Sequence, residues 1–242
     1  LRRQRQMCIR DSIKLFADGA DKDGMLEMYK NPHIDGFTTN PTLMKIAGIT
    51  DYVSFSKDIL TEISDKPVSF EVFADELENM ERQALEIASW AENVYVKIPI
   101  TNTKNESTGG LIKSLSSKGV KLNVTAIFSI EQVKIVASSL NPNYSSFVSV
   151  FAGRIADTGY DPVPYMKEAL TILRSNSKAE LLWASPREVF NVYQADEIGC
   201  HIITATNSIL KKLNLFDKDL EEYSLETVKM FYNDAKNAGY NI

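Results

Sequence analysis

The sequence predicts an α/β fold, a single (β/α)8 TIM barrel with an extra C-terminal helix. From residue 12 onward, short apolar strands alternate with amphipathic helical stretches, which is the pattern of parallel β/α units. Eight strands can be counted, and each is followed by helical patterning, as a barrel of this kind requires. The 242 residues also suit one domain of this fold.

The expected strands are short runs rich in β-branched, aromatic and aliphatic residues. They span residues 13–17, 36–39, 68–73, 94–99, 121–125, 146–151, 179–184 and 200–204. Helical patterning is expected at 51–63, 76–90, 107–117, 129–139, 162–174 and 186–195, with a short helix up to residue 213. Asp217 or Asp219 can cap a last helix over 219–238, which Gly239 ends.

An open, doubly wound sheet is the alternative architecture. It would need a glycine-rich phosphate loop after the first strand, and A-D-G-A-D at 17–21 does not make one. We therefore expect one barrel domain over residues 13–242. Residues 1–12 match neither strand nor helix patterning and contain no apolar stretch typical of a secretory signal. We expect them to be a disordered or non-native extension.

Composition argues against several classes of function. The formal net charge is −5 and no long basic run follows the first ten residues, so we expect no nucleic-acid partner. No stretch approaches the roughly 18 consecutive apolar residues that cross a bilayer, so we expect no membrane span. The two cysteines make no disulfide framework, and the two histidines have no ligand spacing. We expect a cytoplasmic protein without a metal site.

One lysine lies inside an apolar strand, V-Y-V-K-I-P at 94–99. The ordinary interpretation of Lys97 is an edge-strand residue whose amine reaches water. The alternative is a buried amine that attacks a carbonyl and forms a Schiff base. A charge inside an apolar strand is costly unless it is solvated, paired or used in chemistry.

Further polar residues lie near the ends of the other expected strands, where barrels of this kind carry their active residues. They are Asp18, Thr38, Thr39, Asn40, Glu71, Asn123, Thr125, Ser149 and Ser185, with Arg154 and Arg187 in the loops after the sixth and seventh strands. Each also has a plain structural interpretation. Asp18 can cap a helix over 19–28, Glu71 can be an exposed charge, and the arginines can form surface ion pairs.

Strand alternation provides a second argument, because residues two apart share a face. Glu71 shares a face with Ser69 and Phe73 on its strand, Lys97 with Tyr95, and Asn123 with Thr125. If these faces point inward, a lysine, a carboxylate and a hydroxyl meet in one cavity. An amine nucleophile needs such a group to move protons and a polar wall to orient water.

Five stretches of the chain, in order, resemble the transaldolase family. They are D-G-F-T-T-N-P-T-L (35–43), V-Y-V-K-I-P-I-T (94–101), L-N-V-T-A-I-F-S (122–129), F-A-G-R-I-A-D (151–157) and A-S-P-R-E (184–188). T-T-N-P alone is moderately specific, whereas five such stretches in order are strongly specific. The compact length resembles the small transaldolases and the fructose-6-phosphate aldolases.

The resemblance implies a role for each matching residue. Lys97 falls on the Schiff-base lysine, and Asp18 on the aspartate that exchanges protons with the sugar hydroxyls. Glu71 and Thr125 fall on the pair that holds the catalytic water. Substrate contacts are implied for Asn40, Asn123 and Ser149 with the dihydroxyacetone part, for Arg154, Ser185 and Arg187 with the distal phosphate, and for Thr39 and Phe151 beside them.

The activity implied by the resemblance is that of a transaldolase of the pentose phosphate pathway. It would move a dihydroxyacetone unit from a ketose phosphate, fructose 6-phosphate or sedoheptulose 7-phosphate, to an aldose phosphate. No metal or organic cofactor is implied, because the iminium formed on Lys97 takes up the electrons. Small relatives form rings of five and pairs of rings, so the resemblance implies a pentameric or decameric homo-oligomer.

Two other functions stay open on the sequence. A fructose-6-phosphate aldolase would use free dihydroxyacetone, but that branch resembles a glutamine at Glu71 and a tyrosine at Phe151. Both residues therefore favour the transaldolase. A barrel that binds sugar phosphate without catalysis is the third possibility, and the full set of lysine, aspartate, glutamate and threonine argues against it.

Overall fold

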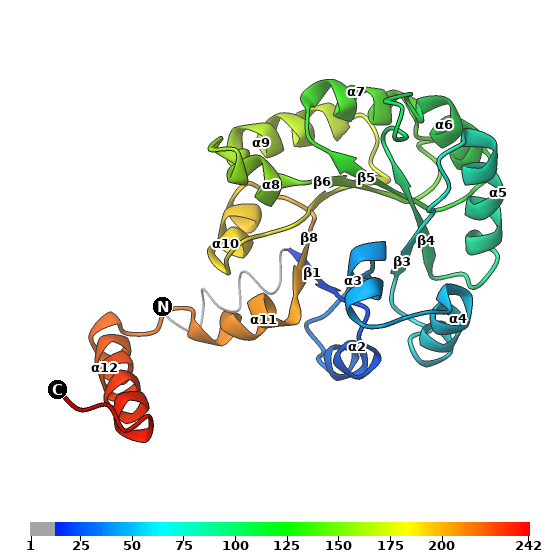
Figure 1. Ribbon diagram of the computed structural model, residues 1–242. Helices are drawn as coiled ribbons and strands as arrows, with labels where there is room; N and C mark the ends of the chain where they lie inside the picture. The colour runs from blue at the N-terminus through cyan, green and yellow to red at the C-terminus, as the bar shows by residue number, and fades with distance from the viewer. Residues whose placement is uncertain (1–12) are drawn as a thin grey trace.

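The computed structural model describes residues 13–242 and shows eight parallel strands in a closed barrel. Each strand pairs with the next one along the chain, and the last pairs with the first (Figure 1). The strands are β1 (Lys14–Asp18), β2 (Gly36–Thr38), β3 (Val68–Glu71), β4 (Val94–Pro99), β5 (Leu122–Ile127), β6 (Ser146–Val150), β7 (Ala179–Trp183) and β8 (Ile202–Thr206). The predicted (β/α)8 fold is confirmed. The extension expected over residues 1–12 lies outside the described residues.

Helices connect the strands and surround the barrel (Figure 1). They are α2 (Lys22–Tyr29), α3 (Pro41–Ile46), α4 (Tyr52–Glu62), α5 (Leu77–Ala88), α6 (Gly109–Ser117), α7 (Ile130–Ser139), α8 (Ala152–Asp157), α9 (Pro162–Leu173), α10 (Phe190–Glu197), α11 (Asn207–Leu210), the 3-10 helix η1 (Lys211–Leu215) and α12 (Leu220–Asn237). Their starts follow local chemistry. Asn40 caps α3 by accepting a hydrogen bond from the Leu43 amide, and Pro41 occupies the first turn. Asp219 caps α12, one of the two aspartates predicted for it.

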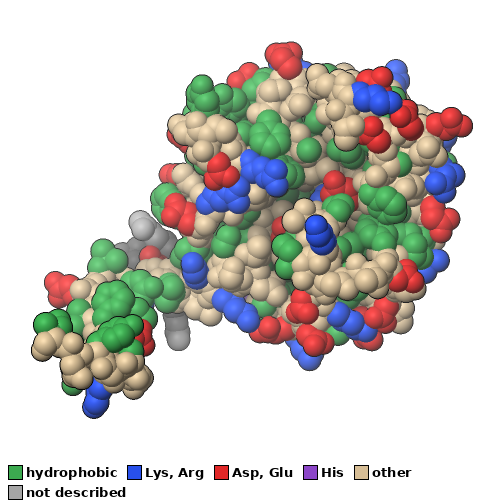
Figure 2. All heavy atoms as spheres, viewed as in Figure 1, with side chains coloured by type: hydrophobic (Ala, Val, Ile, Leu, Met, Phe, Trp, Pro, Cys, Tyr) green, Lys and Arg blue, Asp and Glu red, His purple; other side chains and the backbone are tan. Residues whose placement is uncertain are grey.

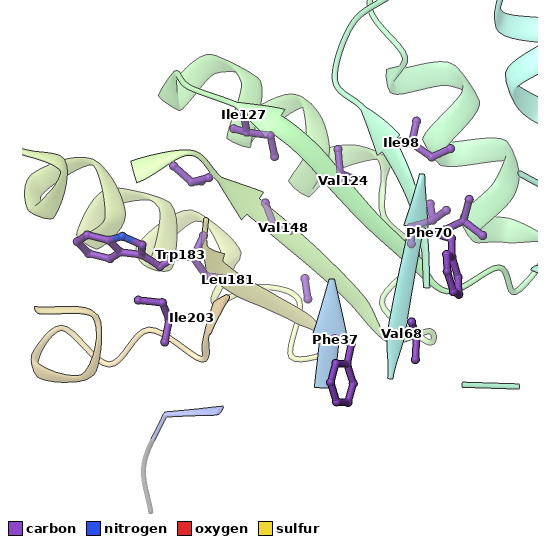
Figure 3. Packing of buried hydrophobic residues seen from close by; sticks show 14 of the residues in the cluster. Phe37, Val68, Phe70, Ile98, Val124, Ile127, Val148, Leu181, Trp183 and Ile203 are labelled. Atoms are coloured by element: carbon purple, nitrogen blue, oxygen red, sulfur yellow. The ribbon is translucent and has the colours of Figure 1, made fainter. Parts of the chain in front are cut away.

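The main core lies between the strands and the helices. Outward-facing strand residues are buried there against apolar residues of the helices, and removing this apolar surface from water stabilises the fold. Figure 3 labels members of this layer on seven of the strands: Phe37, Val68, Phe70, Ile98, Val124, Ile127, Val148, Leu181, Trp183 and Ile203. Both faces of the barrel strands are therefore enclosed, one by helices and the other by the barrel itself.

A second, smaller core fills the inside of the barrel toward the amino ends of the strands. Phe16 and Phe147 meet edge to face with ring centroids 5.5 Å apart, and Tyr95 stacks on Phe147 at 3.9 Å. Gly36 leaves the space that Phe16 needs, because a Cβ there would lie 2.6 Å from the Phe16 ring. This packing closes the barrel at one end. The inward polar residues are left at the carboxyl ends of the strands.

Several predicted boundaries were wrong, and those of the third and eighth strands have clear physical reasons. The third strand ends at Glu71 rather than residue 73, because the Phe73 amide donates to Gln83 instead of to a neighbouring strand. The eighth strand begins at Ile202 and ends at Thr206, two residues later than predicted. Gly199 has a positive φ of 75° and ends the preceding helix, so the chain turns before the strand starts.

The segments after the sixth and seventh strands also differ from the prediction. Arg154 lies on the short helix α8 rather than in a loop, and only Arg187 lies in a loop. The helix expected from residue 186 starts at Phe190. The preceding backbone is held instead by the Asn191 side chain, which accepts hydrogen bonds from the Arg187 and Glu188 amides.

The C-terminal helix α12 projects away from the barrel (Figure 1). None of its residues is buried, although large apolar side chains lie along it, including Leu220, Val228, Phe231 and Tyr232. Figure 2 shows hydrophobic side chains gathered on this helix. In the described part of the chain, no helix combines the length and apolar character that crossing a membrane requires.

Candidate active site

A cavity of about 510 Å³ opens at the carboxyl ends of the strands. All of the predicted site residues except Thr39 line it, together with residues that were not predicted. The polar lining consists of Asp18, Thr38, Asn40, Thr42, Glu71, Lys97, Asn123, Thr125, Ser149, Arg154, Ser185, Arg187, Thr204 and Thr206. The barrel therefore brings the residues of eight separate strands and loops to one place, as expected for this end of the fold.

Lys97 lies at the centre of the site with its side chain only 8% exposed. Its Nζ is 3.0 Å from Glu71 Oε2, and it donates a hydrogen bond of 2.7 Å to the backbone carbonyl of Thr39. The two strands are in register here, so Glu71 and Lys97 are direct neighbours that both point inward. The edge-strand interpretation of Lys97 is wrong. Its amine is held between a carboxylate and a carbonyl, with a proton acceptor at hydrogen-bond distance.

Asp18 ends β1 and faces the same cavity. Burial raises the pKa of its carboxyl, and the Glu71 charge adds to this rise; the Lys97 ammonium and the Thr38 hydroxyl lower the pKa. Thr38 donates to Asp18 Oδ1 at 2.7 Å. Asp18 does not cap the following helix, because Asp21 does so by accepting from the Gly24 amide. The carboxyl is thus free to act as an acid or a base.

A buried chain of polar side chains crosses the site beneath Lys97. Ser149 donates to Asn123 Oδ1 at 2.6 Å, and Asn123 Nδ2 donates to Ser69 at 3.0 Å. These bonds fix which way the Asn123 amide points. Thr125, the next inward residue of β5, has a buried hydroxyl without a protein partner. An unpaired buried hydroxyl that faces a cavity is suited to holding a water molecule or a substrate atom.

The T-T-N-P segment contributes both a backbone carbonyl and side chains to the site. The Thr39 side chain is fully buried and donates to the Ser69 carbonyl, so Thr39 reaches Lys97 only through its backbone carbonyl. Asn40 lines the cavity, and its Oδ1 is already engaged in capping α3. Its amide nitrogen is the group left to donate to a ligand.

Two arginines lie at the mouth of the cavity. Arg154 on α8 stacks over the Phe151 ring at 5.3 Å, and Arg187 forms a two-pronged ion pair with Asp157, in which Nε donates to Oδ1 at 2.9 Å. Arg187 therefore is a surface ion-pair partner as well as a cavity residue. A guanidinium binds phosphate through paired hydrogen bonds, which an ammonium cannot do.

Close backbone packing positions these arginines. Gly153 lies against the loop after β7, where a Cβ would be only 1.6 Å from the Ser185 carbonyl oxygen. Ser185 itself has a positive φ of 60°, an uncommon conformation that clusters at functional sites. A bulge in β5 places Ala126, with φ of 58°, in the same cavity wall.

Sequence reasoning gave no role to three residues of the site: Thr38 and Ser69 were named only by their place on the strands, and Thr204 was not named. Thr38 and Thr204 are buried, and their hydroxyl oxygens are 2.5 Å apart. Strand alternation could have found them, because each faces inward with its site neighbour. Over residues 13–242, no cluster of His, Cys, Asp and Glu has the makeup of a metal site.

Solved structures with the same architecture share little sequence with this chain. KGPDC from Streptococcus mutans is 9% identical with a TM-score of 0.56, covering 83% of this chain and 90% of that one. Dihydrodipicolinate synthase from Rhodopseudomonas palustris is 12% identical with a TM-score of 0.56, covering 93% and 80%. These similarities support the fold alone.

Relatives with higher sequence identity cover nearly the whole chain. A probable transaldolase of Thermoanaerobacter sp. is 32% identical over 231 residues, 95% of this chain and 100% of that protein. A probable transaldolase of Brucella anthropi is 35% identical over 221 residues, 90% of this chain and 97% of that protein. The family model described as transaldolase/fructose-6-phosphate aldolase matches residues 15–242. The chain therefore belongs to the transaldolase/fructose-6-phosphate aldolase family.

Proposed function

We propose that the protein is a transaldolase that transfers a dihydroxyacetone unit from a ketose phosphate to an aldose phosphate. The observation that carries the proposal is the buried Lys97 amine, 3.0 Å from the Glu71 carboxylate, in a cavity that also holds Asp18. An amine with an adjacent proton acceptor can become a neutral nucleophile. A second carboxyl in the same cavity can then serve the bond-breaking step.

The first half of the reaction builds the Schiff base. Lys97 passes its proton to Glu71 and attacks the ketone carbonyl, which gives a carbinolamine. Loss of water then leaves a protonated imine. The Thr125 hydroxyl, which has no protein partner, and Glu71 hold the water that carries these protons. Because the proton moves from the Lys97 amine to Glu71 inside the cavity, no charged intermediate is exposed to solvent.

The second half breaks and remakes a carbon–carbon bond. Asp18 accepts the proton of the substrate hydroxyl next to the bond that breaks, and an aldose phosphate leaves. The electron pair of that bond moves into the iminium, which becomes an enamine on Lys97. The same steps in reverse join the enamine to the acceptor aldehyde. No metal or organic cofactor is needed, because the iminium is the electron sink.

Substrate recognition divides along the cavity. Asn40, Asn123 and Ser149 bind the hydroxyls of the three-carbon unit near Lys97. Arg154, Ser185 and Arg187 bind the distal phosphate at the mouth, with Phe151 supporting the Arg154 guanidinium from below. Charge-assisted hydrogen bonds to phosphate contribute roughly 1.5–3 kcal/mol each. Phosphorylated sugars are therefore the substrate class.

A coupled assay separates the transferase from an aldolase. The protein is incubated with fructose 6-phosphate, and glyceraldehyde 3-phosphate is measured with and without erythrose 4-phosphate. We expect fast release only when the acceptor is present, with sedoheptulose 7-phosphate as the second product. Equal rates without acceptor, with free dihydroxyacetone accumulating, would make the protein a fructose-6-phosphate aldolase instead.

The proposal also covers the oligomeric state of the enzyme and its place in the cell. The apolar side chains on α12 have no partner within the described chain, and burying them against a second copy would remove them from water. We take the assembly to be a homo-oligomer, a pentamer or a decamer. We also propose that the enzyme works in the cytoplasm, in the pentose phosphate pathway, because its proposed substrates are sugar phosphates.

A further inference from the structure

Asp18 receives its hydrogen bond from a chain of two threonine hydroxyls rather than from one isolated donor. Thr38 donates to Asp18 Oδ1 at 2.7 Å, and the hydroxyl oxygen of Thr204 lies 2.5 Å from that of Thr38. Thr38 and Thr204 are only 3% and 5% exposed. Because β1 lies between β2 and β8, the two threonines come from the strands on either side of β1, and their hydroxyls meet across it.

The direction of this chain follows from the donors available. An ionised carboxylate can only accept hydrogen bonds, so the single hydrogen of the Thr38 hydroxyl must be donated to Asp18. The short contact between the two hydroxyls then needs the hydrogen of Thr204, which donates to the Thr38 oxygen. The chain therefore runs from Thr204 to Thr38 to Asp18 whenever Asp18 is ionised.

We propose that Thr204 is a positioning residue, which orients the Thr38 hydroxyl toward Asp18 and so keeps that carboxyl in its proton-accepting form. This inference rests on the proposed function in one respect, which is that Asp18 acts as the base. Without Thr204, the Thr38 hydroxyl can rotate and its hydrogen can be shared with other acceptors in the cavity. The negative charge of the buried Asp18 carboxylate is then less well stabilised, because its hydrogen bond from Thr38 is weaker.

The other charges around Asp18 make this support important. Burial raises the pKa of Asp18, and the Glu71 carboxylate raises it further, while the Lys97 ammonium and the Thr38 hydroxyl lower it. When the carbinolamine loses water and the Schiff base forms, the Lys97 nitrogen is bonded to the substrate, and the hydroxyl chain remains the fixed donor to Asp18. Protonation of Asp18 also lets the chain reverse, because the acid can then donate to Thr38 and Thr38 to Thr204.

The first test compares Thr204→Val with Thr204→Ser by the pH dependence of kcat/KM for transfer from fructose 6-phosphate to erythrose 4-phosphate. Valine nearly keeps the shape but removes the hydroxyl, and serine keeps the hydroxyl. We expect the acidic limb of Thr204→Val to move up by roughly half to one pH unit, which is about a three- to tenfold loss below the wild-type midpoint. Thr204→Ser should follow the wild type.

The second test does not need catalytic activity, so it holds even if the enzyme catalyses another reaction. Unfolding free energies are measured against pH for the wild type, Asp18→Asn, Thr204→Val and the double variant. The difference between proteins with and without Asp18 reports the titration of this carboxyl in the folded state. Removing Thr204 should extend that titration to higher pH by the same shift as in the rate profile.

The outcomes separate this inference from the proposed function. Absence of transfer activity, with the Asp18 titration still shifted by Thr204→Val, would overturn the function and leave the hydroxyl chain in place. An Asp18 titration that is identical in the wild type and Thr204→Val would overturn the inference. So would equal shifts in Thr204→Val and Thr204→Ser, because the effect would then come from packing rather than from the hydroxyl.

Discussion

Three ionisable side chains share one small space at the carboxyl ends of the strands. Lys97 and Glu71 form an ion pair that is largely withdrawn from water, and Asp18 lies in the same cavity. Burial raises the pKa of the Asp18 carboxyl, and the nearby Glu71 carboxylate adds a smaller rise. Different surroundings thus give two carboxyls two different tasks.

Replacing Glu71 with glutamine tests the task of the first carboxyl. Glutamine nearly keeps the shape but cannot take the Lys97 proton, so we expect transfer to erythrose 4-phosphate to fall by about tenfold or more. Release of free dihydroxyacetone should rise, and the pH profile should lose one titrating group. Both activities staying within about twofold, with unchanged folding, would remove Glu71 from the proton transfers.

Replacing Asp18 with asparagine tests the second carboxyl through stability. Because burial raises its pKa above the ordinary 3.8, folding favours the protonated form. That stabilisation is complete below the ordinary pKa and is lost as the pH rises through the folded-state pKa. We expect Asp18→Asn to be inactive but more stable than the wild type at about pH 8, by about 1.4 kcal/mol per unit of raised pKa.

The measurement for this variant is chemical denaturation at a series of pH values. The two proteins should differ least at about pH 2.5, well below the ordinary pKa, where Asp18 is protonated in both the folded and unfolded chains. A wild type that is more stable than Asp18→Asn at high pH would contradict the raised pKa.

Residue identities in the site were largely predictable, while their contacts were not. The inward faces of two neighbouring strands identify Glu71 and Lys97, because alternation has a strict period of two. Thr204 ended the predicted eighth strand but was given no role, because its contact with the Thr38 hydroxyl joins two strands that are not neighbours and follows only from the closed barrel. Phe73 was placed on the same face as Glu71, but the strand has already ended and its ring is 63% exposed.

Among the elements, the short helix α8 and the loop after β7 pack together around the proposed phosphate site. Arg154 and Asp157 both lie on α8, and Asp157 holds the guanidinium of Arg187 from that loop. Gly153 makes the close approach possible, since any side chain would meet the Ser185 carbonyl. The spacing of the two arginines therefore depends on a residue that has no functional group.

Gly153→Ala tests this dependence. A Cβ at 1.6 Å from a backbone oxygen forces α8 away from the loop, and we expect a loss of about 3 kcal/mol in stability. KM for fructose 6-phosphate should rise, because Arg154 moves with the helix. Thermal denaturation and steady-state kinetics measure the two effects.

Gly110→Ala is the matched control, because a Cβ there meets nothing within 4 Å and the position is exposed on α6. It should keep wild-type kinetics and change stability by at most about 1 kcal/mol, toward higher stability. Equal behaviour of the two variants would show that close packing at Gly153 does not position the site.

The elements that sequence reasoning missed are those without periodicity. α8 has only six residues, too few for a 3.6-residue pattern to appear. The delayed start of α10 depends on Ser185 in a left-handed conformation, which residue preferences assign to glycine or asparagine. Long helices such as α5 and α12 carry repeated apolar positions, and Asp219 caps α12, so their existence was predictable and only their ends shifted.

On the scale of the whole molecule, the barrel has one filled end and one open end. Aromatic rings around Phe16 and Phe147 fill the inside at the amino ends, and the polar cavity takes the carboxyl ends. The helix α12 stands apart from both and presents unburied apolar side chains. The apolar and polar parts of the barrel interior therefore lie at opposite ends, and the proposed catalysis uses the polar end while the proposed assembly uses the helix outside the barrel.

Phe231→Glu tests the assembly. A charge in the middle of the apolar stripe of α12 cannot be buried without a partner, so we expect dissociation of the proposed ring to smaller species. Asn233→Glu places the same charge on the other side of the helix and should leave the assembly intact. Analytical ultracentrifugation compares the three proteins. A wild type that sediments as a monomer would contradict the homo-oligomer.

Trapping of the substrate on Lys97 tests the central claim most directly. The protein is incubated with fructose 6-phosphate and borohydride, digested, and analysed by mass spectrometry. We expect a reduced three-carbon adduct on Lys97 together with loss of activity. Lys97→Arg should keep the charge but give no adduct, because a guanidinium stays protonated and is a poor nucleophile. An adduct on another lysine, or active protein with no adduct, would contradict the mechanism.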